Sequence, residues 1–250
     1  WLLAELGVIR QAAATSPLRS EQDNTYYEPI VLENKPKFAV IDPEKVDDYL
    51  TLCEHIKEHG HELTYKAIVV FPYAQGPTFG NESLTEAQSA RAKTVGVKFV
   101  KWEDFLEIGE PCLPAEQKPE NLHSIVYTSG TTSQYPKGTV LTQQSFVDER
   151  ARLEQYAYED TIYYSYIPMA HISERGALAV FIGFGCTIGF ASGGVDTLLD
   201  DFEILKPSQF VSVPLLLKAI YLKAMAAIRA TGNREMVNAM FKKKFGGGSC

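Results

Sequence analysis

The sequence predicts an α/β protein with mainly parallel sheets flanked by helices, and two observations support that prediction. Apolar runs of strand length alternate with segments of helical periodicity along nearly the whole chain. The 250 residues, 45% hydrophobic and 22% charged, also have the composition of a globular protein rather than a disordered or fibrous one. A chain of this length forms one large domain or two modest ones. We expect two lobes, residues 1–160 and residues 161–250, with a soft boundary near residues 157–162.

The first lobe is expected to hold four strands, each at a run rich in Val, Ile or aromatic residues. Its helices are expected where apolar residues recur at helical spacing between start and stop signals, such as Asp42-Pro43 before one helix and Gly60 after it. The strands are expected at residues 38–41, 65–71, 97–100 and 123–127, and the helices at residues 1–14, 44–59, within 72–96, at 102–106 and at 143–156. Residues 111–121 and 128–138 are expected to be loops.

The second lobe is expected to continue the alternation, with strands at 162–167, 187–190 and 210–213 and helices at 173–184, 196–205 and 215–230. Its most apolar stretch, residues 177–191, is shorter than the ~20 residues of a membrane span. The glycines of that stretch, Gly183, Gly185 and Gly189, suit a buried helix, turn and strand.

The net charge and the cysteine pattern indicate which ligands and which cellular compartment the protein is suited to. The net charge is −7 and the isoelectric point is about 5.3, which disfavours binding to a nucleic-acid backbone. The four cysteines are widely separated and form no CxxC pair, and no signal peptide opens the chain. We therefore expect a cytoplasmic protein, whose membrane association, where it occurs, would come from parts outside this sequence.

The segment from Tyr127 to Gly138 carries the strongest functional signal. It follows a predicted strand and contains five Ser or Thr hydroxyls, two glycines and one lysine. Hydroxyls and backbone N–H groups donate to phosphate oxygens, and glycine lets the backbone approach an anion closely. Lys137 adds a mobile positive charge that can follow a departing pyrophosphate. The alternative is an ordinary Ser/Thr-rich surface turn. A Walker A loop is excluded, because here the lysine precedes the glycine.

This segment closely resembles the signature Y-T-S-G-T-T-G-x-P-K-G of the adenylate-forming enzymes, which include acyl-CoA synthetases, luciferases and peptide-synthetase adenylation domains. Residues 166–174, 185–190 and 201–214 resemble, in order and spacing, segments of the long-chain acyl-CoA synthetase branch. The resemblance covers nearly the whole chain and is most specific in the loop. The loop is one residue longer than the family pattern, with Ser133-Gln134-Tyr135 in place of glycine and one further residue.

The resemblance implies a ligase that uses MgATP to convert a long-chain fatty acid into an acyl-adenylate and then transfers the acyl group to CoA. ATP, Mg²⁺, CoA and the fatty acid are the implied small-molecule partners. Lys137 would neutralise charge that develops on pyrophosphate, and the hydroxyl of Thr128 would contact Mg²⁺. The implied ATP-binding residues are Thr128, Ser129, Gly130, Thr131, Thr132, Lys137 and Gly138.

The same resemblance places His171 and Glu174 beside the substrate carboxylate and acyl chain. The alternatives are that His171 caps a helix or is satisfied in the core, and that Glu174 pairs with Arg175 or His171.

The resemblance also implies that the chain is the N-terminal part of a longer enzyme, without the C-terminal domain, and is inactive by itself. Lys137 is the one catalytic residue that it assigns within this sequence, and the other catalytic residues would lie beyond Cys250. Two other functions also fit: a nucleotide- or acyl-binding module without turnover, and a ligase for a shorter or aromatic acid.

A weaker cluster lies before Gly60, where Cys53, His55, His59 and His61 are close in sequence. His55 and His59 fall on one predicted helix face, and zinc sites use such spacing. Zinc ligands are normally drawn from two separate pairs, however, and the surrounding residues are rich in charge. We therefore interpret the cluster as a solvated helix end.

Overall fold

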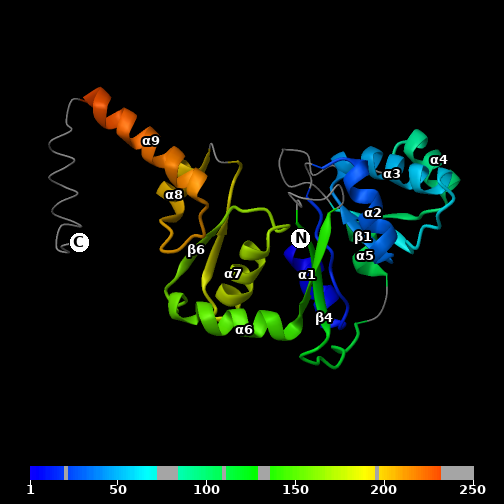
Figure 1. Cartoon of the computed structure of the whole chain (residues 1–250), viewed down its shortest axis with the longest axis horizontal. Helices are drawn as coiled ribbons and strands as arrows, with labels where there is room; N and C mark the ends of the chain where they lie inside the picture. Colours follow the sequence, from blue (N-terminus) through cyan, green and yellow to red (C-terminus); the bar gives the residue numbers. More distant parts are fainter. Residues whose placement is uncertain (20–21, 72–83, 109–110, 129–135, 195–196, 232–250) are drawn as a thin grey trace. The chain divides into compact units, whose positions relative to one another are not determined.

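The computed structural model describes residues 1–19, 22–71, 84–108, 111–128, 136–194 and 197–231 (Figure 1). These residues form two compact units with an α/β architecture. The first unit comprises residues 1–157 and 167–184, and the second comprises residues 158–166 and 185–250. Among the helices within the described ranges, none combines the length and the hydropathy of a membrane-spanning segment.

A parallel three-stranded sheet organises the first part of unit 1, with strand order β1-β2-β3. The register pairs Phe38 with Ala67 and Ile68 with Phe99. The elements are α2 (Asn24–Asn34), β1 (Phe38–Ile41), η1 (Pro43–Lys45), α3 (Val46–Glu58), β2 (Ala67–Val70), α4 (Glu86–Val95), β3 (Phe99–Lys101) and α5 (Trp102–Glu107). All three strands lie where the apolar runs predict them, and α3 ends before Gly60, whose φ is +78°.

The core of this part is formed by residues that recur at helical spacing on α3 and by residues of the central strand β2. Leu50, Cys53 and Ile56 of α3 and Ile68 of β2 are fully buried. Burial raises the pKa of the Cys53 thiol to about 12, because an apolar environment disfavours the thiolate. Cys53 therefore faces the core and is separate from the exposed histidines near it in sequence.

Helix α2 has no counterpart among the elements predicted from the sequence. Asp23 caps its start by accepting a hydrogen bond from the Tyr26 backbone N–H at 3.2 Å. Pro29 lies inside the helix, where proline removes one backbone hydrogen bond. Burial of Tyr27, Ile30 and Val31 holds the helix against the core in spite of that loss.

An antiparallel hairpin forms the second part of unit 1. Strand β4 (Leu122–Thr128) pairs with β5 (Lys137–Thr142). Residues 137 and 138 were expected to end a loop and residues 139–142 had no predicted element, so this strand was not predicted. Thr15 adds a parallel bridge to Ser124 after α1 (Leu2–Arg10), which ends earlier than residue 14. The flanking helices are α6 (Gln143–Leu153), which η2 (Glu154–Tyr156) follows, and α7 (Ile172–Gly183), which contacts α6 (Figure 1).

The described residues of unit 2 form a two-stranded parallel sheet and two helices. The elements are β6 (Ile162–Ser165), β7 (Thr187–Phe190), α8 (Leu198–Leu205) and α9 (Pro214–Thr231). The strand expected at 210–213 does not form; Gln209 makes only an isolated bridge with Tyr163. A Cβ on Gly189 would lie 2.3 Å from Cδ2 of Leu205, so this glycine lets α8 pack directly on β7.

Candidate active site

The predicted phosphate-binding segment starts and ends on paired strands. Thr128 is the last residue of β4, Lys137 is the first residue of β5, and the two are cross-strand partners. The backbones of these two predicted ligands are therefore adjacent, at one end of the hairpin.

Several of the predicted site positions lie outside the described residues. They are Ser129, Gly130, Thr131, Thr132 and the divergent Ser133-Gln134-Tyr135. Cys250, beyond which the other catalytic residues are expected, also lies outside the described residues. Of the predicted catalytic and ATP-binding residues, the structure therefore places Thr128, Lys137 and Gly138.

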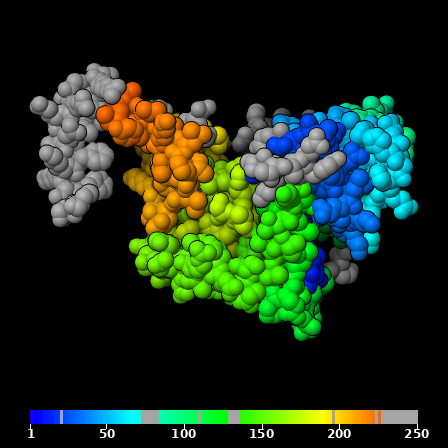
Figure 2. Space-filling model, viewed as in Figure 1, coloured from blue at the N-terminus to red at the C-terminus, as the bar shows by residue number. Residues whose placement is uncertain are grey.

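Lys137 is exposed and makes no ion pair with any residue inside the described ranges. The next residues of β5 are exposed as well, and Val140 retains 62% of its accessible surface. Figure 2 shows the green part of the chain, to which β4, β5 and α6 belong, on the face viewed. A lysine that no described carboxylate neutralises, beside a hydroxyl-rich segment, provides a donor set that fits a polyphosphate.

Gly138 is required by packing beneath the segment. A Cβ at this position would lie 2.8 Å from Cγ2 of Ile125 and 3.1 Å from Cζ of Tyr127. Real Cβ atoms are not found at the first of these distances, so Ile125 and the Tyr127 ring occupy the space that a side chain would need. Gly138, which is predicted to bind ATP, therefore also allows the close packing of β5 on Ile125 and Tyr127.

The Tyr127 side chain anchors the hairpin to the C-terminal end of α2. Tyr127 is 3% exposed, and its hydroxyl lies 2.8 Å from Oε2 of Glu33, to which it donates, and 3.0 Å from Oδ1 of Asn34. Burial, together with the nearby Glu33 carboxylate, raises the pKa of the phenol. Asn34 in turn donates to Oγ of Ser16 at 2.9 Å. The roles of Glu33 and Asn34 are not predictable from local sequence, since no helix is predicted at residues 24–34.

The two predicted substrate residues lie on α7 in different environments. His171 is the N-cap residue of α7, is exposed, and makes no capping hydrogen bond with its side chain. Glu174, three residues later, is fully buried. Arg175 pairs with Glu5 of α1, its Nε donating to Oε1 at 2.7 Å.

A buried polar cluster surrounds that ion pair and includes His123, which no sequence motif singles out. Arg175 also donates to Oγ1 of Thr15 at 2.8 Å, and its guanidinium lies 5.8 Å from the ring centre of Phe146. The imidazole of His123 stacks on Phe146 with a centroid separation of 3.6 Å. Burial and then the charge of Arg175 lower the pKa of His123 to about 4, so His123 is neutral at pH 7.

Comparison with known proteins shows a family match over nearly the whole chain. The model of a family described as "AMP-binding enzyme" matches residues 1–248. The peroxisomal long chain acyl-CoA synthetase 7 of Arabidopsis thaliana is 38% identical over 141 residues, which are 55% of this chain and 20% of that protein. Long chain acyl-CoA synthetase 4 of the same plant is 30% identical over 229 residues, which are 87% of this chain and 32% of that protein.

A solved structure with the same fold is the A-PCP didomain of carboxylic acid reductase from Segniliparus rugosus in complex with AMP. It matches with a TM-score of 0.76 and 20% identity, over 91% of this chain and 32% of that one. The chain thus spans about a third or less of the length of these proteins.

Proposed function

The chain belongs to the AMP-binding enzyme family, and from that premise we propose that it is part of an AMP-forming ligase that activates a long-chain fatty acid for transfer to CoA. The family match supports adenylate chemistry with ATP, and the similarity to long chain acyl-CoA synthetases supports the acid and CoA. In this proposal the ligase has an N-terminal lobe within residues 1–160 and a second lobe that begins near residue 161.

The observation that carries the proposal is the hairpin pair of Thr128 and Lys137. In the proposed reaction the β- and γ-phosphates of ATP lie in the segment that this pair delimits. Lys137 binds them and neutralises the charge that builds up on pyrophosphate as the bond to the α-phosphate breaks. The hydroxyl of Thr128 would contact the Mg²⁺ that accompanies ATP, and backbone and hydroxyl donors of residues 129–132 would complete the phosphate site.

The proposed acyl side of the site uses His171 and Glu174. His171 is suited to contact a substrate because it is exposed at the start of α7 and its side chain is not used as a cap. Glu174, being buried, is suited to hold the start of α7 in position. We therefore propose that His171 touches the substrate and that Glu174 is a positioning residue. In this proposal the other catalytic residues belong to a part of the ligase that follows Cys250.

ATP–pyrophosphate exchange tests the proposal directly. The assay uses a protein that carries this chain within a complete AMP-binding enzyme, with palmitate as the acid and MgCl₂ present. We expect Lys137→Ala to lower the exchange rate by about 10²–10³-fold, the typical loss when one donor to a developing anion is removed. Lys98→Ala is the matched control, because Lys98 is also an exposed lysine of unit 1. Equal rates for the two variants would contradict the phosphate role.

A panel of acids distinguishes the long-chain ligase from a ligase for a shorter or aromatic acid and from a binding module without turnover. We expect palmitate to support exchange better than octanoate, acetate or benzoate. Preference for benzoate or acetate would replace the long-chain assignment by a ligase for an aromatic or short acid. If none of the acids supports exchange while ATP binding is measurable, the protein is a nucleotide-binding module without turnover. Chelation of Mg²⁺ by EDTA is expected to abolish exchange.

A cytoplasmic location is also part of the proposal. It rests on the wide separation of the four cysteines in the sequence, which is typical of a protein of a reducing compartment. Cell fractionation with a compartment marker tests it, and recovery of the protein with the peroxisomal marker would contradict it.

A further inference from the structure

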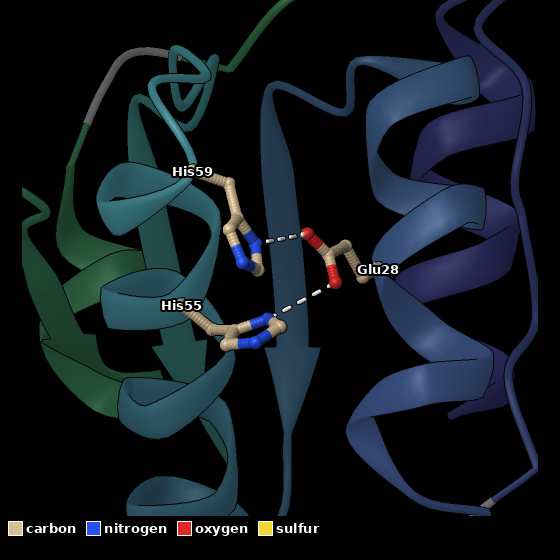
Figure 3. A group of neighbouring side chains, drawn as sticks. All are labelled: Glu28, His55 and His59. Atoms are coloured by element: carbon tan, nitrogen blue, oxygen red, sulfur yellow. Dashed lines mark hydrogen bonds and ion pairs between the residues drawn. The ribbon is translucent and has the colours of Figure 1, made fainter.

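Three side chains from two helices of unit 1 meet on its surface (Figure 3). Glu28 comes from α2, His55 from the last turn of α3, and His59 is the C-cap residue that follows α3. Oε2 of Glu28 lies 3.0 Å from Nδ1 of His55, and Oε1 lies 3.2 Å from Nδ1 of His59. Both imidazoles therefore point at a single carboxylate, and each faces a different oxygen.

The packing of α2 on α3 places these groups together. Val31 of α2 and Ile56 of α3 belong to the same buried core cluster, which fixes the separation of the two helices. His55 and His59 are four residues apart, so they lie one helical turn apart on the same face. Their ring centres are 4.1 Å apart, and the side chains are 46% and 53% exposed.

From this arrangement we infer that Glu28, His55 and His59 form a binding site for a divalent transition metal of the zinc class. Two imidazoles and a carboxylate are a common zinc ligand set. The possible ligand atoms all lie within 4.8 Å of one another. Zinc bonds of about 2.0–2.2 Å place the ligands of a tetrahedron about 3.3–3.6 Å apart. The nitrogen–oxygen separations of 3.0 and 3.2 Å here run to different oxygens of Glu28, so small side-chain rotations would bring one oxygen and both Nδ1 atoms to this spacing.

The open side of the site supplies the fourth position. The two histidines are about half exposed, so a water molecule can complete the coordination of the metal. Binding requires each imidazole to carry its proton on Nε2, so that the Nδ1 lone pair faces the metal. Without metal the same Nδ1 atoms donate hydrogen bonds to the Glu28 carboxylate, which keeps the three side chains assembled.

The metal would connect α2 to α3 and so stabilise the helix that supports the hairpin. Glu33 and Asn34, at the end of α2, contact the hydroxyl of Tyr127, the residue before Thr128. The site therefore acts as a clamp on the base of the phosphate-binding segment, and its metal takes no part in the ligase reaction. This inference is independent of the proposed function, because metal binding is measured without ATP or acid.

Calorimetric titration and thermal melting of the untagged 250-residue chain with ZnCl₂ test the clamp. We expect one zinc per chain and, at a zinc concentration of about 100 times the dissociation constant, a rise in Tm of about 5–10 °C. MgCl₂ at the same concentration is expected to give no rise, because Mg²⁺ prefers oxygen ligands. CoCl₂ is expected to give the visible absorption bands of tetrahedral Co²⁺.

The variants Glu28→Gln and His55→Gln are each expected to weaken zinc binding at least tenfold. His61→Gln is the matched control, since His61 is an exposed histidine nearby that lies outside the group. Histidine modification by diethylpyrocarbonate, read by mass spectrometry on the unaltered chain, avoids any folding defect of the variants. Zinc is expected to protect His55 and His59 and leave His61 reactive. Absence of zinc binding, or equal protection of all three histidines, would overturn the inference.

Discussion

At the scale of single residues, His123 makes the stability of the chain depend on pH. The pKa of His123 is lowered from 6.5 to about 4 by burial and by Arg175, so the folded state binds fewer protons than the unfolded state between these values. The stabilisation is complete above pH 6.5 and is lost as pH falls towards 4. Its size is up to about 3 kcal/mol. Urea unfolding of the native chain is expected to show that the free energy of unfolding rises with pH between about pH 4 and pH 6.5, and this rise is the slope to be measured.

The slope is expected to disappear in His123→Gln, although that variant is also less stable at pH 7 because it loses the stacking on Phe146. The exposed His61 serves as the control, and His61→Gln is expected to retain the slope. An unchanged slope in His123→Gln would show that other groups cause the pH dependence.

Gly138 gives a second prediction at this scale. The Cβ of Gly138→Ala would overlap Ile125 and the Tyr127 ring, so we expect a loss of about 1–3 kcal/mol in the free energy of unfolding. Gly7→Ala is the matched control, because a Cβ on Gly7 of α1 meets nothing within 4 Å. That change is expected to stabilise the chain by about 0.5–1 kcal/mol, since alanine is the better helix former. Chemical denaturation of both variants measures the difference.

At the scale of elements, α2 and the hairpin are joined through one phenol. Tyr127→Phe is expected to cost about 1–2 kcal/mol, because it leaves Glu33 and Asn34 without the hydroxyl that lies between them. Tyr158→Phe is the control, as Tyr158 is 62% exposed. Thermal melting compares the two. If the proposed function holds, Tyr127→Phe also weakens pyrophosphate binding, whereas Tyr158→Phe does not.

The elements also show which parts of the fold the sequence could predict. The parallel strands were predictable because Val- and Ile-rich runs stand between clear breakers, as at 67–70. Helix α2 was missed because Pro29 disfavours a helix locally, and only the burial of Ile30 and its neighbours outweighs that. Strand β5 was missed because its mostly exposed residues gain their strand structure from pairing with β4.

The candidate sites, like the elements, were predictable only where local sequence determines them. The hydroxyl-rich segment and Lys137 are recognisable from local sequence, because hydroxyls, glycines and a cation occur within one short stretch. Glu33, Asn34 and Glu28 are not recognisable in that way, since their partners are distant in sequence and reach them only through the packing of α2. The histidine pair alone does not indicate a metal site for the same reason, because Glu28, the third proposed ligand, comes from another helix.

At the scale of the whole molecule, the exposure of the hairpin predicts how much chemistry this chain performs alone. Electrostatic stabilisation of a transition state is strong only in a site that excludes water, and Lys137 with the residues after it is exposed here. We therefore expect the 250-residue chain to bind ATP weakly through Lys137 and to make no palmitoyl-CoA. Chromatography of reaction mixtures with palmitate, ATP and CoA measures this, and palmitoyl-CoA formed by the chain would contradict it.

The cross-strand pairing of Thr128 with Lys137 has a further consequence for how the connecting segment can evolve. The pairing fixes the distance that the segment must close, so its length can change without moving either strand. Loop-closure entropy grows only with the logarithm of length, and one residue added to a segment of this size costs about 0.1 kcal/mol. The extra residue among Ser133, Gln134 and Tyr135 is thus expected to cost little in the free energy of folding.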